Sequence, residues 1–210
     1  MDFFLKQWQE LSSVKDDLAM RDWFYATTGN LSMRLTDSPL TFLVTANGKD
    51  KRKRDDDDFI VVNELGERVF SVDREPSIET YLHTIIYEKT VANCILHVHT
   101  VYNNVISELY FNKGVIVFSN HEMVKKYYED SIKQADVIVI PIIENVSDKA
   151  EFEKSFARQV LSDEGAILVH NHGLTVWASS AQAAKKKLEA LEFLFQYQTI
   201  LHSTKIQILK

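Results

Sequence analysis

Cysteine is almost absent from this 210-residue sequence, and proline and glycine are scarce. The single cysteine, Cys94, excludes a disulfide within the chain and is compatible with a reducing compartment. Its apolar neighbours indicate a small buried side chain rather than a nucleophile. Three prolines and six glycines suggest neither a low-complexity linker nor a disordered tail. We therefore expect a core that folds without disulfide bonds.

Long apolar runs and an excess of positive charge are also missing. No window approaches the roughly eighteen apolar residues of a membrane span. The segment MDFFLKQWQE lacks the basic start and the long apolar centre of a signal peptide. The net charge of −6 argues against general nucleic-acid binding. These absences predict a cytoplasmic protein whose partners include neither nucleic acid nor a membrane.

Hydrophobic residues make up 45% of the chain and charged residues 26%, enough for one large or two small domains. Apolar periodicity predicts helices over residues 3–20, 76–90, 100–111, 120–130, 148–162 and 180–204. Strands are predicted within residues 26–35, 41–48, 91–100, 114–119, 135–143 and, on both sides of a turn, 165–179. Hairpins early and helices later indicate a mixed or antiparallel sheet with helices on its faces.

Two further segments invite a specific prediction. FIVVNELGERVFSV, residues 59–72, resembles a hairpin of two strands around an ELGE turn. KDKRKRDDDD, residues 49–58, is a charge block that we interpret as a solvated loop. A nuclear localisation signal is the weaker alternative, because the four aspartates that follow neutralise the charge of the basic cluster.

Two pairs of histidines end apolar strands. In NCILHVHT, His97 and His99 are two positions apart, so their side chains point to the same face of a strand. In LVHNHGLTVW, His170 and His172 end another apolar run before a glycine. Three histidines with an open position are typical of catalytic zinc, whereas structural zinc sites are closed and often rich in cysteine. The alternative is that each pair is a hydrogen-bonded element of the core or surface.

Proton transfer needs an acid or a base beside such a metal. Glu79 lies at the start of a predicted helix, and Glu122 in the turn after the strand at 114–119. Either carboxylate is equally compatible with a first-turn position favoured by the helix dipole. The segments TTGNLS and TANGKDK, with Thr27, Asn30 and Asn47, are glycine turns whose amides could hold an anion, although alone they are ordinary turns.

Taken together, these residues resemble a known family. ATTGNLS, VTANGKDK, PSIETYLHT, HVHT and HNHGLTVW occur in this order, and at about this spacing, in the class II aldolase/adducin family. The resemblance covers essentially all of residues 1–210 as a single domain. It implies a three-layer α/β/α sandwich with a mainly antiparallel central sheet, and a homotetramer with active sites between subunits. RDWFYATTGNLSMR, PSIETYLH, NHEMVK and IPIIEN are most similar to a dehydratase of methionine salvage within the family, which implies a small phosphorylated ketose as substrate.

The resemblance also assigns roles to residues. It implies one Zn²⁺ per subunit bound by His97, His99 and His172, with His170 a neighbour of this site. Glu79 matches the catalytic glutamate of the aldolases, and Glu122 the acid/base of the dehydratase. The phosphate group would be bound by Gly29, Asn30, Asn47, Gly48 and Ser77.

The sequence departs from the family pattern in the phosphate pocket. Many relatives have serine or threonine at position 47, and aldolases have a second serine at position 78, where this chain has Asn47 and Ile78. An asparagine amide can still donate a hydrogen bond, but isoleucine cannot. The departure argues mildly against a standard sugar-phosphate aldolase. An aldolase or epimerase remains one alternative, and a non-enzymatic adducin-like scaffold is another.

Overall fold

The computed structural model describes residues 2–131 and 134–208. Six α-helices are described: α1 (Asp2–Met20), α2 (Thr80–Lys89), α3 (Val101–Tyr110), α4 (Glu122–Tyr128), α5 (Lys149–Gln159) and α6 (Ala181–Ile208). The eight described strands are β1 (Asn30–Asp37), β2 (Leu40–Thr45), β3 (Phe59–Asn63), β4 (Cys94–Val98), β5 (Val115–Ser119), β6 (Val137–Ile143), β7 (Gly165–Val169) and β8 (Gly173–Ala178). The predicted helices and most predicted strands are confirmed within a few residues.

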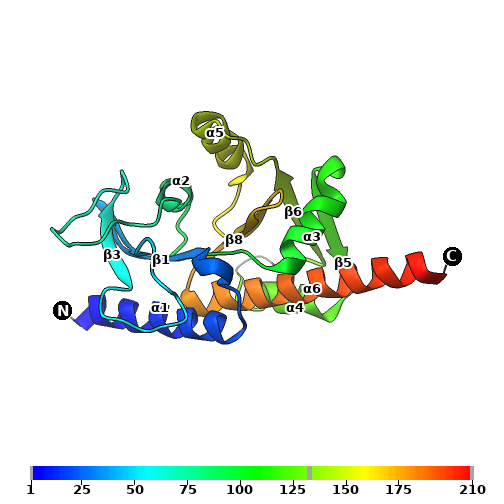
Figure 1. Ribbon diagram of the computed structural model, residues 1–210, viewed down its shortest axis with the longest axis horizontal. Coiled ribbons are helices and arrows are strands. Elements are labelled where there is room, and N and C mark those ends of the chain that lie inside the picture. Colours follow the sequence, from blue (N-terminus) through cyan, green and yellow to red (C-terminus); the bar gives the residue numbers. More distant parts are fainter. Residues whose placement is uncertain (1, 132–133, 209–210) are drawn as a thin grey trace.

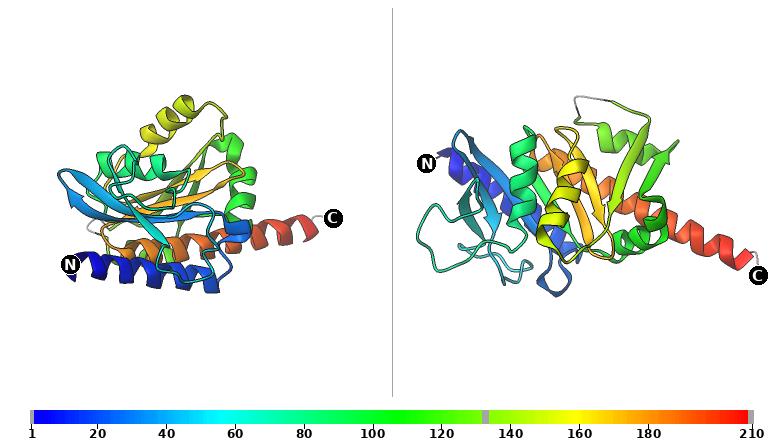
Figure 2. Two further views of the ribbon diagram at one scale, coloured as in Figure 1. Left: turned by 60° about the vertical axis from the view of Figure 1, so that its left-hand side comes forward. Right: turned by 90° about the horizontal axis from the view of Figure 1, so that it is seen from above.

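All eight strands form one sheet in the order β3-β2-β1-β4-β8-β7-β6-β5. Neighbouring strands are antiparallel except β6 and β7, which are parallel. Helices α1, α4 and α6 lie on one side of the sheet, and α2 and α5 on the other (Figures 1 and 2). The predicted three-layer α/β/α sandwich with a mainly antiparallel sheet is therefore confirmed.

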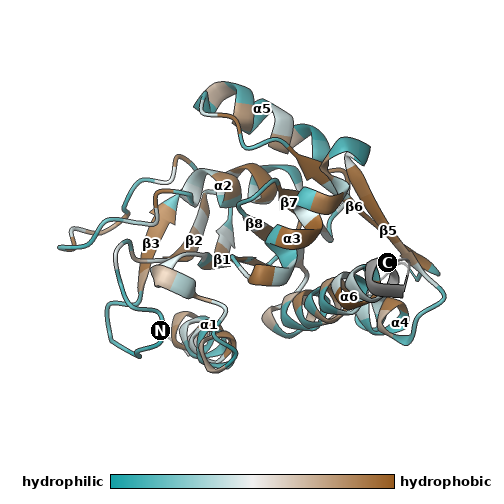
Figure 3. Cartoon of the chain, turned by 45° about the vertical axis from the view of Figure 1, so that its right-hand side comes forward, coloured by the Kyte–Doolittle hydropathy of each residue, from teal (hydrophilic) through white to brown (hydrophobic). Residues whose placement is uncertain are grey.

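Each face of the sheet has its own apolar core. Strands β4 and β8 alternate between the two cores: Leu96 packs toward α1 and α6, whereas Ile95 and Trp177 pack toward α2 and α5. Because both faces are covered, these strands read as continuous hydrophobic runs, and the colouring of Figure 3 shows the apolar sheet strands between more polar helices. Burial of β4 and β8 on both faces gives the strand ends that hold the histidines a rigid base.

The predicted hairpin over residues 59–72 is wrong in its second half. β3 forms as expected, but the segment after it makes only a single bridge, from Val62 to Arg68, and no second strand. The Asn63 side chain accepts hydrogen bonds from backbone N–H groups of the following turn. β3 is at the edge of the sheet, and Val69 and Phe70 beyond it are exposed, so no core stabilises a further strand.

The charge block at residues 49–58 is only partly the solvated loop that we predicted. Its middle, residues 52–56, is exposed, but Lys51 and Asp58 are buried. The burial of Asp58 is compensated by an ion pair, because its carboxylate lies 2.7 Å from the ammonium group of Lys15 on α1. Charge pattern alone could not reveal this, since the partner lies far away in the sequence.

Candidate metal centre and substrate site

His97 and His99 are placed by the end of β4. This strand is hydrogen-bonded on both sides, to β1 and to β8, which fixes its extended backbone and turns both imidazoles to the same face. The Nε2 atoms of His97 and His99 lie 2.8 Å apart. Nδ1 of His97 lies 2.9 Å from Oγ1 of Thr175 on β8. When Nδ1 donates to this hydroxyl, Nε2 of His97 keeps its lone pair for a metal.

His172 reaches the same place from the turn between β7 and β8. Asn171 has φ = 48°, so the chain leaves the strand geometry there and turns His172 toward His97 and His99. The ring centres of His172 and His99 are 4.6 Å apart. Gly173 is required by the close approach, because a Cβ at this position would lie 2.7 Å from Cδ2 of His99 and from the carbonyl oxygen of Val98.

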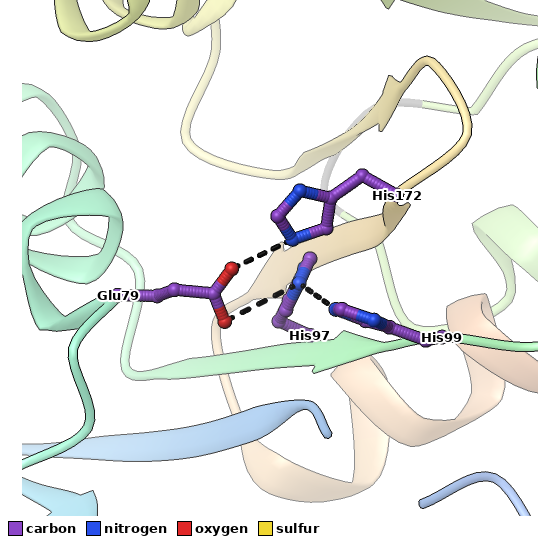
Figure 4. A group of neighbouring side chains, drawn as sticks. All are labelled: Glu79, His97, His99 and His172. Atoms are coloured by element: carbon purple, nitrogen blue, oxygen red, sulfur yellow. Dashed lines mark hydrogen bonds and ion pairs between the residues drawn. The ribbon is translucent and has the colours of Figure 1, made fainter. Parts of the chain in front are cut away.

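Glu79 completes the group from the residue before α2. Its Oε1 lies 2.7 Å from Nε2 of His172, and its Oε2 lies 3.7 Å from Nε2 of His97 (Figure 4). The Asn30 amide donates to Oε2 of Glu79 at 2.6 Å, and the ring of His83 is hydrogen-bonded to the Asn30 side chain in turn. The four side chains of Glu79, His97, His99 and His172 each present a ligand atom within 4.8 Å of the others. We call this set the four-donor group.

The electrostatics of the four-donor group suit a cation. Burial lowers the pKa of His97 to about 4 and that of His99 to about 3, so both imidazoles are neutral at pH 7. Burial alone would raise the pKa of Glu79, but His97 and His172 beside it outweigh this effect and lower the pKa below its ordinary value. Neutral imidazoles and an ionised carboxylate are the donor set that a divalent metal binds. The group could therefore hold a metal ion.

The residues predicted to bind phosphate lie on two turns and one strand-like segment beside this group. Ala46 bridges to Pro76, Asn47 donates its backbone N–H to Glu75, and Ser77 donates its own to Thr45. The segments that contain Asn47 and Ser77 are therefore paired with each other. Gly29 has φ = 79°, and a Cβ there would lie 2.6 Å from the carbonyl oxygen of His97. Gly48 also has a positive φ, 70°. We call Gly29, Asn30, Asn47, Gly48 and Ser77 the phosphate cradle.

His170 and Glu122 lie outside the four-donor group. The His170 ring stacks on Phe111, with ring centres 3.8 Å apart, and its Nε2 lies 2.6 Å from the Glu108 carboxylate. Glu122 begins α4, where its carboxylate is 63% exposed and pairs with Lys125 at 3.0 Å. Within this one chain, neither side chain meets the group.

Sequence reasoning missed three side chains that support the site. Thr175 contacts His97, and Glu192 of α6 accepts hydrogen bonds from Thr100 and Asn103, just after His99. Lys51 is buried near Glu79. Of these three, only Thr175 could have been found from the sequence, by pairing the two predicted strands: in the antiparallel pair it lies directly opposite His97.

The sequence that builds this site matches that of a known protein family. The sequence profile of the Class II Aldolase and Adducin N-terminal domain matches residues 9–199. The chain belongs to the class II aldolase and adducin family. The predicted family resemblance is thereby confirmed, over almost the whole chain.

Several individual members of the class II aldolase and adducin family are similar to this chain. The methylthioribulose-1-phosphate dehydratase of Geobacillus kaustophilus (strain HTA426) is 50% identical over 200 residues, which cover 94% of this chain and 93% of the relative. That of Bacillus subtilis (strain 168) is 48% identical over 208 residues, 98% of each chain. Among solved structures, l-fuculose-1-phosphate aldolase from Thermus thermophilus superposes with a TM-score of 0.74 at 20% identity, covering 96% of this chain and 97% of the other. That likeness shows a shared fold.

The structure also bears on the expected absence of a membrane span. Over the described part of the chain, no helix combines the length and the apolar character needed to cross a bilayer.

Proposed function

We propose that the protein is a hydro-lyase of methionine salvage that removes water from 5-methylthioribulose 1-phosphate and yields 2,3-diketo-5-methylthiopentyl 1-phosphate. The single observation that supports this most is the identity of about one half, over nearly full length, to relatives named methylthioribulose-1-phosphate dehydratase. The four-donor group supplies the donors that such chemistry needs.

We infer that the metal is one Zn²⁺ per chain, bound by His97, His99 and His172. Three imidazoles match catalytic zinc, and the hydrogen bond between His97 and Thr175 is the kind of contact that orients a ligand. When bound, zinc would polarise the substrate carbonyl at C2 and stabilise the negative charge that develops as the C3 proton leaves. Glu79, held by Asn30, would order the solvent or substrate oxygens next to it.

Loss of the C4 hydroxyl requires a proton, because hydroxide is a poor leaving group. We assign this proton to Glu122, and with it the removal of the C3 proton. Because Glu122 is exposed and outside the four-donor group of its own chain, we propose that it acts in a site between subunits of a homotetramer. Two exposed aromatic residues of α6, Phe193 and Tyr197, lie against His121, the residue before Glu122, and supply apolar surface for such an assembly.

The methylthio end of the substrate needs an apolar environment. A hollow of about 660 Å³ is lined by His99 and His172, and its lining also includes Tyr25, Val101 and Val105. The phosphate cradle residues Asn47 and Ser77 do not line it. We propose that the substrate spans the metal centre, with its phosphate in the cradle and its methylthio group in this hollow.

An aldolase activity is the alternative that the phosphate cradle disfavours. Ile78, at the position of a second serine in aldolases, is 78% exposed and has no hydroxyl to offer a phosphate. Incubation with 5-methylthioribulose 1-phosphate should therefore produce diketone absorbance. Release of a free aldehyde instead would overturn the proposal in favour of an aldolase.

Turnover of Glu122→Gln and Glu79→Gln, with metal content measured on the same samples, tests the roles. Glu122→Gln cannot deliver a proton, so turnover should fall about a hundred- to ten-thousand-fold with zinc retained. Glu79→Gln should cost less. If Glu122→Gln keeps near-normal turnover while Glu79→Gln is inactive with metal in place, Glu79 is the base.

Subunit mixing tests whether the site is shared. Tetramers reassembled from Glu122→Gln and His172→Ala chains should regain activity, because some sites would combine an intact Glu122 with an intact metal centre. Mixtures that stay as inactive as the parents, or light scattering that shows an active monomer, would contradict a shared site.

A further inference from the structure

Three lysine side chains of the described chain are almost fully buried, and one of them is paired differently from the others. Lys15 lies 2.7 Å from the Asp58 carboxylate, and Lys187 lies 3.3 Å from the Glu164 carboxylate. Lys51 is only 6% exposed, yet among the side chains that the structure describes no carboxylate forms an ion pair with it. A buried ammonium without a counter-ion is costly, so its retention calls for an explanation.

The hydrogen bonds of Lys51 are also incomplete. Its Nζ donates to the carbonyl oxygen of Thr27 at 2.5 Å, and that is its one hydrogen bond among the described residues. An ammonium group has three N–H donors. Two of them remain available for an acceptor that enters from outside the chain.

The position of Lys51 indicates which acceptor this is. Lys51 follows Gly48 by three positions, and the carbonyl of Thr27 lies two positions before Gly29. The ammonium, which comes from the loop that follows Gly48, therefore contacts the turn that precedes Gly29. Burial lowers the pKa of Lys51 to about 8, and the negative charge of Glu79 opposes this shift, so the group is largely protonated at pH 7.

The phosphate cradle itself contains no cation. Its five residues, Gly29, Asn30, Asn47, Gly48 and Ser77, are neutral, and the Glu79 carboxylate beside them repels an anion. Other basic residues nearby already have partners: Lys49 lies 2.8 Å from Asp55, and Arg74 lies 2.6 Å from Asp57. A phosphate dianion in the cradle therefore needs a positive charge that these residues do not supply.

We propose that the Lys51 ammonium, which reaches from the Gly48 loop to the turn before Gly29, is the cationic contact for the phosphate group of the substrate. The inference rests on the proposed function for the presence of a phosphorylated substrate. A charge-assisted contact of this kind adds affinity for an anion that the neutral donors alone do not provide.

Binding of inorganic phosphate to the metal-loaded protein, measured by calorimetry, is the direct test. Lys51→Met should weaken the phosphate Kd by about ten- to a hundredfold, the range expected for a hydrogen bond to a charged group. Lys51→Arg should retain part of the affinity. Lys53→Met is the matched control, because Lys53 is in the same loop but exposed, and its Kd should stay within about twofold of the wild type.

Steady-state kinetics with the phosphorylated ketose provide a second test of the phosphate contact. If Lys51 binds the phosphate remote from the reacting carbons, Lys51→Met should raise KM by a similar factor and leave kcat within severalfold. A fall in kcat with unchanged KM would overturn the proposal, because it would place Lys51 at the chemistry. Loss of zinc from Lys51→Met would overturn it as well, by showing a structural role.

Phosphate affinity that is equal in the wild type and Lys51→Met would show that phosphate binds elsewhere, for example on the metal, and would also overturn the proposal. If Lys51→Met does not fold, the ¹⁵N signal of the Lys51 ammonium in the wild type should shift on addition of phosphate, and an unchanged signal would refute the contact. A wild type that binds phosphate through Lys51 but does not dehydrate the ketose would refute the proposed function alone.

Discussion

His97 and His99 point into the four-donor group together, whereas His170 and His172 point in different directions at the end of β7. The first pair lies at the end of a strand hydrogen-bonded on both sides, so the two-residue period of a strand applies to it. The second pair lies in a turn, where Asn171 has φ = 48°. His172 faces the group, and His170 packs on Phe111. The same sequence spacing therefore has a different meaning inside and outside a strand.

The largest difference between two variants should be found within the second pair, between His172→Ala and His170→Ala. His172→Ala removes a proposed zinc ligand, so we expect loss of bound metal and at least about a hundredfold loss of turnover, with the fold retained. His170→Ala should keep its metal and lose less than about tenfold in turnover. Its contact with Glu108 is largely exposed, so the cost in stability should be about 1 kcal/mol, mainly from stacking on Phe111.

Metal analysis by mass spectrometry and thermal melting of both variants check this expectation. Equal metal loss in the two variants would mean that the two histidines do not differ in function. Full metal retention in His172→Ala would remove it from the ligand set.

A smaller effect should follow from the support of the first pair. Thr175→Val removes the hydroxyl 2.9 Å from Nδ1 of His97 while keeping the shape of the side chain. We expect zinc affinity to fall about ten- to a hundredfold, as is typical when a partner of a metal ligand is lost. Thr175→Ser keeps the hydroxyl and should retain most of the affinity. Competition with a chromophoric chelator measures both variants, and identical affinities would show that Thr175 does not orient His97.

Substitution of Glu192, which contacts Thr100 and Asn103 after the first pair, should have the smallest effect on activity but a measurable effect on stability. Burial raises the pKa of Glu192 to about 7, although hydrogen bonds from Thr100 and Asn103 oppose the shift. Because the folded-state pKa is above the ordinary 4.5, the stabilisation is complete below about pH 4.5 and is lost as the pH rises through 7. The free energy of unfolding should thus fall by up to about 3 kcal/mol from this group over that interval.

Glu192→Gln should remove this pH dependence, as urea unfolding between pH 5 and pH 8 would report. Glu189→Gln is the control, because Glu189 is on the same helix but about one-third exposed and paired with Arg21. A slope that is unchanged in Glu192→Gln would show that other groups set the pH response.

The parts of the site that were predictable follow local rules. The placement of His97 and His99 follows from strand alternation, and that of Glu79 from the start of a helix. The choice of His172 over His170 came from the family resemblance, since spacing alone does not separate them. The turn geometry that decides it depends on a positive φ that residue type does not dictate.

The remaining features depend on distant partners, which explains why sequence reasoning missed them. The charge pattern predicted that Lys51 and Asp58 lie in solvent. It could not show that Asp58 is paired with Lys15, a residue of another element. Likewise, Glu192 contacts Thr100 although 92 positions separate them in the chain. The second strand expected after β3 has the right composition but no core to pack on. Local pattern predicts an element; tertiary packing decides whether it forms and which polar groups it buries.

Glu79 and His172 touch although 93 positions separate them in the chain. No short fragment of the protein contains all four donors, and the entropy of loop closure keeps them apart in the unfolded chain. In the folded chain they meet beside β4 and β8, which are paired in the middle of the sheet. A metal ion held by all four donors would therefore bind only the folded chain, and its binding would stabilise the folded state.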